Sequence, residues 1–454
     1  MRRKEPANYW SEYENETHHD LVWVHIHGAA AVHIRHYDWK REEKVTSLRT
    51  QECHIRGQAL EGSSTQGRMV KFMWQQAPEN TIESLRHGIQ INDGIEFDVR
   101  MTRDGELIIH HDANVSVPQS KLPHEYTWVE NHTLEELTSL GFPSFRSMLE
   151  DSGIQKQWRD QGKMGCIEFK RPHPSALYGG GVFGKSQHIS HVSAMMQKTE
   201  TLLKEFEIPS DNTVYYSFHK GMKASVQSSG SIRPWAELMP YIPPFGTHYT
   251  KRMRGSIQFF ATSIARLIKS HRRSGAFMAP CAIDYFLPPI SHLPLGFAGG
   301  LHGAKAARLS SNQRGFPIYV WPTSLDVEHD VLAAGLTGLT DSSDPEVTWL
   351  PSGHARWNQP GSRPLDAVQQ HTLEQSTKEN HKEILGELHG ETIPWSECDA
   401  SRRSELVEMW RKKWMWEKST SEILEDSSSA SPPWEAIRLI GHRGSGKTSR
   451  PVLE

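Results

Sequence analysis

Short apolar runs alternate with amphipathic stretches along most of this chain of 454 residues. Residues 94–101, 164–170 and 213–219 have the pattern of strands, and residues 192–206 have the pattern of a long amphipathic helix. Such alternation indicates βα units and a parallel sheet, because parallel strands need a crossover connection. Polar residues follow several of these strands, at the end where a (β/α)8 barrel carries its active site. We therefore expect an α/β protein built on a (β/α)8 barrel.

Local patterns predict where further elements begin. Asn80 is expected to cap a helix, because Glu83 completes a capping-box pattern three residues later. Residues 257–268 are expected to be helical. Residues 281–286 and 316–321 are expected to form two more strands, and the second of them ends in tryptophan.

Composition excludes several classes of protein. The formal net charge of −3 and a pI near 6.8 do not support binding to nucleic acid. The four cysteines are scattered without a CxxC pair, which favours reduced thiols in an intracellular compartment. No apolar run approaches the roughly 20 residues of a membrane span, and the N-terminus has no apolar signal segment. We expect a cytoplasmic protein without a transmembrane segment.

Changes in composition divide the chain into four parts. Residues 1–70 form an irregular extension rich in His and Trp, and residues 71–351 would form the barrel. Residues 352–433 are polar and low in β-branched residues, which predicts a linker or partly helical extension without a second core. Residues 434–454 begin with a compact run that has the pattern of a strand.

Paired acidic residues mark the most informative stretch of the sequence. Glu96 and Asp98 are two apart on a strand-like run, so both carboxylates project from the same face. A turn and a second short strand then lead to His111 and Asp112. Acids and a histidine at one end of a sheet suggest a hard-metal site beside an acid/base group. A solvated strand face with a polar turn is the alternative that this spacing leaves open.

An ordered set of short motifs resembles the glycerophosphodiester phosphodiesterases. The resemblance covers about Pro78 to Trp349, and each motif alone is weak. In order, the motifs are Pro-Glu-Asn-Thr, Glu-Phe-Asp-Val, Thr-Arg-Asp-Gly, His-Asp, Ile-Glu-Phe-Lys, Ser-Phe, Val-Trp and Thr-Asp. The resemblance implies a TIM-type barrel like that of the phosphatidylinositol phosphodiesterases.

One motif of this family is displaced. The opening His-Arg-Gly is missing before Pro78 and occurs instead at residues 442–444. Either the chain is circularly permuted, with residues 436–441 as the first barrel strand, or it ends in a truncated second copy. Closure of the barrel favours the permuted arrangement, because an open barrel exposes two strand edges. Residues 441–448 also match a P-loop pattern, but the helix that such a loop requires has no room to follow.

The resemblance implies a role for each residue of the site. Glu96, Asp98 and Glu168 correspond to the metal ligands of the family, and oxygen ligands suit Ca²⁺ or Mg²⁺. His442 and His111 correspond to the two histidines that act as general acid and base. The expected substrate and phosphate contacts are Arg443, Lys170, Glu79 and Trp321.

The function that the resemblance implies is metal-dependent hydrolysis of glycerophosphodiesters to glycerol 3-phosphate and an alcohol, in glycerophospholipid metabolism. A lysophospholipase D acting on a lipid phosphodiester is one alternative. An impaired paralogue that binds metal or phosphodiester without turnover is another, and the position of His442 discriminates between an active enzyme and this impaired paralogue. The basic stretch 251–273 would suit peripheral contact with an anionic membrane, although a barrel helix with a basic solvent face is the better explanation.

Overall fold

The computed structural model describes residues 74–115, 128–173, 175–176, 185–218, 221–238, 262–287 and 300–448. The N-terminal extension expected at residues 1–70 lies outside them. So do residues 257–261 of the helix expected at residues 257–268; within the described residues this helix begins at Ile264.

Parallel strands form a nearly closed barrel, eight of them within the described residues. Their order around the barrel is β5-β4-β3-β1-β9-β8-β7-β6. The N–H of Phe277, just before β6, donates to the carbonyl of Trp235 in β5 over 2.9 Å and so bridges the two ends of this order. The predicted (β/α)8 barrel is confirmed. The strands are β1 (Gly94–Met101), β3 (Met164–Phe169), β4 (Thr213–Ser217), β5 (Trp235–Glu237), β6 (Ala279–Ala282), β7 (Ile318–Thr323), β8 (Thr337–Thr340) and β9 (Leu439–Gly441), and β2 (Leu107–Ile109) pairs antiparallel with β1.

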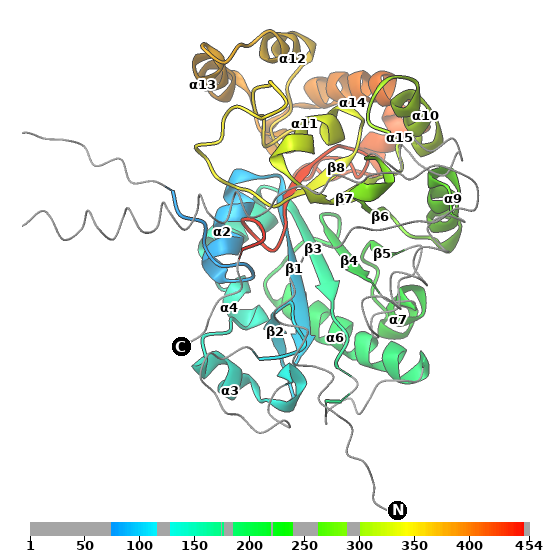
Figure 1. The fold of residues 1–454 in the computed structure, drawn as a ribbon. Coiled ribbons are helices and arrows are strands. Elements are labelled where there is room, and N and C mark those ends of the chain that lie inside the picture. Colours follow the sequence, from blue (N-terminus) through cyan, green and yellow to red (C-terminus); the bar gives the residue numbers. More distant parts are fainter. Residues whose placement is uncertain are drawn as a thin grey trace, which may run out of the picture. The chain divides into compact units, whose positions relative to one another are not determined.

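The C-terminal strand β9 lies between β1 and β8. Gly94 of β1 pairs with Ile440, and Leu339 of β8 pairs with the same residue from the other side, both in parallel register. Figure 1 shows this segment in red between the blue and yellow strands. A strand from the far end of the sequence therefore takes the place of the barrel's first strand, as the displaced motif predicted.

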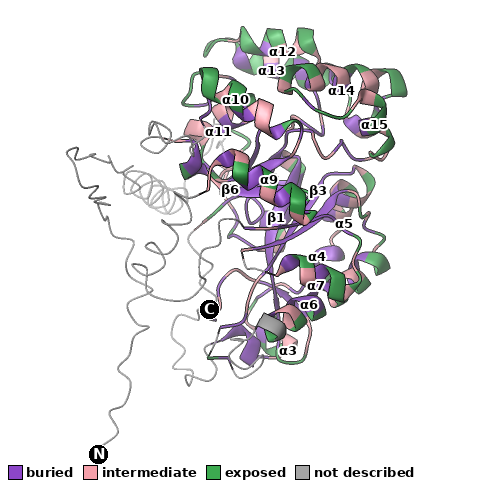
Figure 2. Cartoon of the chain, turned by 90° about the vertical axis from the view of Figure 1, so that its right-hand side faces the viewer, coloured by how far each residue is buried: buried purple, intermediate pink, exposed green. Residues whose placement is uncertain are grey.

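Helices cover the outer side of the barrel and bury their apolar faces against it. Inward-pointing and outward-pointing residues alternate along each strand, and the outward ones, such as Phe97, Val99 and Phe169, pack beneath the helices. Figure 2 shows buried strands surrounded by helices that are exposed on one side. No helix in the described ranges is long and apolar enough to cross a membrane. The covering helices are α2 (Ile82–Ile91), α4 (Phe145–Leu149), α5 (Ser152–Gln155), α6 (Lys185–Glu205), α7 (Met222–Ser229), α9 (Ile264–Ser274), α10 (Gly303–Gln313) and α11 (Leu325–Ala333), and the short α3 (Leu134–Ser139) packs beside β2 in a separate cluster.

Two local predictions were wrong. Thr81, and not Asn80, caps α2, because the Thr81 hydroxyl accepts the N–H of Ser84. Asn80 adopts a left-handed backbone with φ of 59°, and its side chain turns into the barrel. The strand expected at residues 281–286 ends at Ala282, and a short 3-10 helix follows it.

The polar stretch after β8 is more ordered than its composition suggested. It holds four α-helices, α12 (Ala367–Glu374), α13 (His381–Glu391), α14 (Ala400–Trp414) and α15 (Thr420–Glu425). Tryptophans form the centre of two apolar clusters here, one around Trp395 and Trp410 and one around Trp357. These large side chains let a few apolar residues bury enough surface for a core.

This helical extension packs against the barrel. Glu417 forms an ion pair with Arg272 of α9 at 3.0 Å, and its N–H donates to the carbonyl of Arg314 over 3.1 Å. A Cβ added at Gly335 would lie 2.7 Å from Trp414, so this glycine permits close approach between the two parts. The packing positions the chain to re-enter the barrel as β9.

Asp93 joins the extension, β9 and β1 at one buried point. One of its carboxylate oxygens accepts the N–H and hydroxyl of Ser362 at 2.7 and 2.6 Å, and the other accepts the N–H of Leu439 at 2.8 Å. The residue is 2% exposed, so these donors have no access to water. Asp93 therefore holds the incoming strand at the floor of the barrel.

We predict that Asp93→Ala lowers the free energy of unfolding by about 2–5 kcal/mol, because two buried backbone N–H groups lose their acceptor. Urea denaturation measures the change. Asp160→Ala is the control, because its ion pair with Arg159 is exposed and such pairs contribute little. Equal stability of the two variants would contradict the anchoring role of Asp93.

Candidate active site

The barrel interior is apolar at its floor and charged toward the carboxyl ends of its strands. Met164, Val214, Tyr319 and Ile440 belong to an interior apolar cluster. Glu168 lies two residues beyond Cys166 on β3, on the same inward face but nearer the carboxyl end. The charged layer is therefore placed where barrels of this type bind their ligands.

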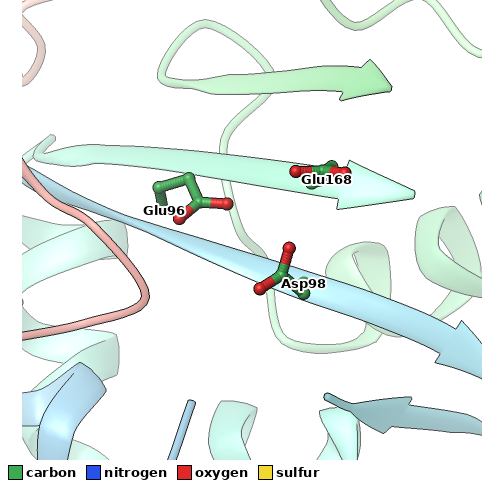
Figure 3. A group of neighbouring side chains, drawn as sticks. All are labelled: Glu96, Asp98 and Glu168. Carbon is green, nitrogen blue, oxygen red and sulfur yellow. The ribbon is translucent and has the colours of Figure 1, made fainter. Parts of the chain in front are cut away.

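Three acidic side chains converge in this layer. Glu96 and Asp98 come from β1 and Glu168 from the neighbouring β3, and one oxygen from each lies within 4.8 Å of the others. Figure 3 shows the three carboxylates on the same side of the two strands. All are buried, with at most 3% exposure. Three close carboxylates without nitrogen or sulfur donors form a ligand set that fits a hard divalent cation.

Hydrogen bonds from three different segments hold two of these carboxylates. The hydroxyl of Tyr216 on β4 donates to Oε1 of Glu96 over 2.7 Å, and the backbone N–H of Arg443 donates to its Oε2 over 2.9 Å. The side-chain amide of Asn80 donates to Oδ2 of Asp98 over 2.9 Å. The positions of the oxygens are thus set by neighbours as well as by the strands themselves.

Lys170 lies between two of the acids. Its ammonium is 2.9 Å from Oδ1 of Asp98 and 2.5 Å from Oε1 of Glu168. Although burial favours neutral Asp98, the positive charges of Lys170 and Arg443 hold its pKa well below the ordinary value. Burial raises the pKa of Glu168 to about 8 in spite of Lys170. Asp98 and Glu168 raise the pKa of Lys170 against the effect of burial, so this lysine is charged at neutral pH.

β9 brings His442 to the edge of the acidic group. Nδ1 of His442 is 2.6 Å from Oδ1 of Asp341, just after β8, and Nε2 is 3.8 Å from Oε2 of Glu96. The backbone N–H of His442 donates to the carbonyl of Thr340. Burial opposes the charged form of Asp341, but its hydrogen bond with His442 lowers its pKa. Asp341 therefore fixes one ring nitrogen and leaves the other facing the acids.

Arg443 lies on the other side of these acids. Its guanidinium donates to Oε1 of Glu79 over 2.7 Å, and its Nε is 3.6 Å from Oδ2 of Asp98. The second oxygen of Glu79 accepts the N–H of Thr448 over 3.2 Å. Asp98, Glu79 and Glu96 raise the pKa of Arg443, although burial lowers it. Glu79 orients the guanidinium and does not belong to the metal-type group among the described residues.

The remaining predicted residues lie around this centre. His111 is partly exposed, its Nδ1 is 2.8 Å from Oδ1 of Asp112, and burial and the charge of Lys170 lower its pKa. Trp321, at the carboxyl end of β7, contacts the ring of Phe218 edge-on with centroids 4.9 Å apart. Lys170 lies over the same phenylalanine ring at 5.7 Å, so Trp321 is one ring removed from the charged layer.

The turn after β9 does not have P-loop geometry. The N–H of Gly444 donates to the backbone carbonyl of Glu96, and the N–H of Ser445 donates to the hydroxyl of Ser84 in α2. These donors face protein acceptors, and the described residues that follow, up to Thr448, contain no helix. That this motif binds no nucleotide stays a prediction.

Several residues of the site were missed from the sequence. Asp341 belongs to the Thr-Asp motif, yet only the fold places it beside His442. Asn80 belongs to Pro-Glu-Asn-Thr, and its expected capping role concealed its contact with Asp98. Nothing in the sequence marked Tyr216 as a site residue except its position on β4, where alternate side chains point into the barrel.

Comparison with known families indicates the same family as the sequence motifs. Residues 73–214 match the model of the Glycerophosphoryl diester phosphodiesterase family. The predicted family resemblance is confirmed. A glycerophosphodiester phosphodiesterase of Caldanaerobacter subterraneus is 38% identical over 64 residues, which is 14% of this chain. The match spans only a quarter of that relative's length.

Solved glycerophosphodiester phosphodiesterases match this chain at lower sequence identity but over a larger share of its length. The enzyme from Thermotoga maritima is 14% identical, with a TM-score of 0.36 over 59% of this chain and 90% of its own. A putative enzyme from Galdieria sulphuraria is 17% identical, with a TM-score of 0.38 over 60% and 91%. An Oleispira antarctica phosphodiesterase, solved with the product sn-glycerol-3-phosphate, is 15% identical, with a TM-score of 0.37 over 60% and 90%.

The contact between α2 and the turn after β9 reverses the usual effect of a glycine-to-alanine substitution in a helix on stability. A Cβ at Gly88 in α2 would collide with the carbonyl oxygen of Gly444. Alanine normally stabilises a helix interior relative to glycine by roughly 0.5–1 kcal/mol. We predict that Gly88→Ala instead destabilises the protein by about 1–3 kcal/mol, because the turn must move.

Gly386 in α13 is the matched control, since a Cβ there meets nothing within 4 Å. Gly386→Ala should leave the melting temperature unchanged or raise it in the same calorimetric series. A stabilised Gly88→Ala variant would show that the turn does not dock on α2.

Proposed function

We propose that this protein is a metal-dependent glycerophosphodiester phosphodiesterase that releases glycerol 3-phosphate and an alcohol. The observation that carries the proposal is the position of β9. It brings His442 within 3.8 Å of Glu96 and Arg443 within 3.6 Å of Asp98, so both halves of the family motif set meet in one place. A chain whose His-Arg-Gly motif lay away from the acids would favour an impaired paralogue.

The charge balance supports a divalent cation. Glu79, Glu96, Asp98 and Glu168 are buried together in the described structure, against the fixed positive charges of Lys170 and Arg443. Burial, with the nearby charges of Asp98 and Glu96, raises the pKa of Glu168 to about 8, and a bound cation would favour the charged form of this carboxyl. Glu96, Asp98 and Glu168 would hold Ca²⁺ or Mg²⁺. When bound, the ion supplies charge neutralisation at a phosphate oxygen.

His442 and His111 are proposed as the general acid and base. Each imidazole has a carboxylate partner at one nitrogen, Asp341 for His442 and Asp112 for His111. Such a partner fixes the tautomer and the direction of the free nitrogen, as in other acid/base sites. One histidine assists attack of water on phosphorus, and the other protonates the departing alkoxide.

The substrate contacts follow from the surrounding groups. Arg443 and Lys170 bind the phosphate, and the planar guanidinium offers two parallel donors to its oxygens. Glu79 orients Arg443 through the 2.7 Å hydrogen bond. Trp321 and its partner ring Phe218 would line the glycerol or alcohol side.

A lipid phosphodiester is the second candidate substrate, favoured by one surface feature. Helices α9 and α10 contain no acidic residue. Together with Arg314, the C-terminal cap residue of α10, they carry seven lysine and arginine side chains. Most of these groups are exposed, although Arg272 pairs with Glu417 of the extension. A basic face of this kind suits peripheral contact with an anionic membrane. The described part covers 262–273 of the basic stretch predicted at 251–273.

We predict that glycerophosphocholine hydrolysis requires added Ca²⁺ or Mg²⁺ and stops in excess chelator. His111→Ala should lower kcat by on the order of 10²–10⁴, because an acid/base partner is lost. His302→Ala is the control, since its side chain is 74% exposed on the barrel surface. Full activity in chelator would overturn the metal assignment, and preferential cleavage of lysophosphatidylcholine would favour the lipid alternative.

We also predict that Asp341→Asn lowers kcat by on the order of 10²-fold or more, with a smaller change in KM, because His442 loses the group that fixes its tautomer. A surface Asp–His pair provides the control: Asp330→Asn removes the partner of His302, 3.2 Å away, and should leave kcat unchanged. Steady-state kinetics with both variants, each checked by its melting temperature, measures the difference. An unaltered kcat in Asp341→Asn would show that the reaction does not depend on orientation of His442 by Asp341.

A further inference from the structure

Tyr216 contacts the acidic group without belonging to it. Its side chain enters the barrel from β4, is 4% exposed, and donates its hydroxyl to Oε1 of Glu96 over 2.7 Å. The other oxygen of Glu96 accepts the backbone N–H of Arg443 over 2.9 Å. Both oxygens of this carboxylate are therefore held, one from β4 and one from the turn after β9.

The length of the tyrosine side chain suits this contact. β3 lies between β4 and β1, so the two strands that carry Tyr216 and Glu96 are about 9–10 Å apart. A serine or asparagine at this position would be too short to span β3 and reach the carboxylate. A phenol spans the distance with only two side-chain torsions to restrict, so little entropy is lost on fixing it.

We propose that Tyr216 is a positioning residue that fixes the Glu96 carboxylate for binding of the divalent cation. The inference rests on the metal site of the proposed function. It goes beyond that site because Tyr216 is not one of the three acidic residues that would bind the cation. Hydrogen-bond partners of metal ligands orient the ligand atoms, and losing one commonly weakens metal binding by 10- to 100-fold. Without the hydroxyl, Glu96 would be held at one oxygen and free to turn the other away.

The test is the affinity of the full chain for Ca²⁺ and Mg²⁺, measured by isothermal titration calorimetry at fixed pH. Tyr216→Phe should raise the Kd about 10- to 100-fold. Tyr215→Phe is a matched control, since Tyr215 is the next residue on β4, faces the outer core and packs against Phe169. Tyr319→Phe is a second control, inside the barrel but in its apolar floor. Both controls should keep the Kd within about threefold of the parent.

Unfolding by urea without metal separates positioning from general destabilisation. If the three variants lose similar stability and only Tyr216→Phe loses metal affinity, the positioning role holds. An unchanged Kd in Tyr216→Phe, or an equal rise in all three variants, would overturn it. The titration needs no turnover, so a parent protein that binds Ca²⁺ without hydrolysing glycerophosphocholine would sink the proposed activity alone. A parent that binds neither cation would sink both.

Discussion

Burial of charge at the open end of the barrel is the constraint on which this structure depends. A carboxylate loses its hydration when it is buried, and this loss is unfavourable unless hydrogen-bond donors or positive charges replace the water. Each acid here has at least one fixed donor: Tyr216 and Arg443 for Glu96, Asn80 and Lys170 for Asp98, and Lys170 for Glu168. These donors come from four separate segments. The site can therefore exist only when those segments are all in place.

The strand β9 connects this electrostatic requirement to the fold. It pairs with β1 on one side and with β8 on the other, and within five residues of it the chain also supplies His442, Arg443 and the donors of the following turn. The helical extension packs against α9 through Glu417, and Asp93 fixes the entry of the strand. Closure of the barrel and completion of the charged layer are one event, because the same short segment performs both.

Sequence reasoning succeeded where the information is local. The strand at residues 94–101 was predicted to the residue, and the period-two spacing of Glu96 and Asp98 placed both on the inner face. The pairing of β9 was inferred from a displaced motif and from the cost of an open edge, which are arguments about the whole barrel. The cores of the extension were missed because a few tryptophans are outnumbered by polar residues in a composition window.

Other features were beyond local reasoning because they depend on side chains that meet only in the folded chain. Asp341 and His442 are 101 residues apart, and nothing in either segment specifies the other. Tyr216 lies on a buried strand where an aromatic residue is unremarkable, and its contact with Glu96 depends on the strand order. Asn80 was misassigned because a residue that favours helix caps also tolerates the left-handed backbone that it adopts here.

The distance along the chain between β9 and its neighbours has a kinetic consequence. Asp93 and Leu439, which meet at the barrel floor, are 346 residues apart in sequence. Contacts of such separation form late, since a long loop must close before they stabilise the chain. Until then β1 and β8 each present an unpaired parallel edge, the kind of surface through which folding intermediates associate. The segment that completes the site thus also ends the period in which the unfinished barrel is vulnerable to aggregation.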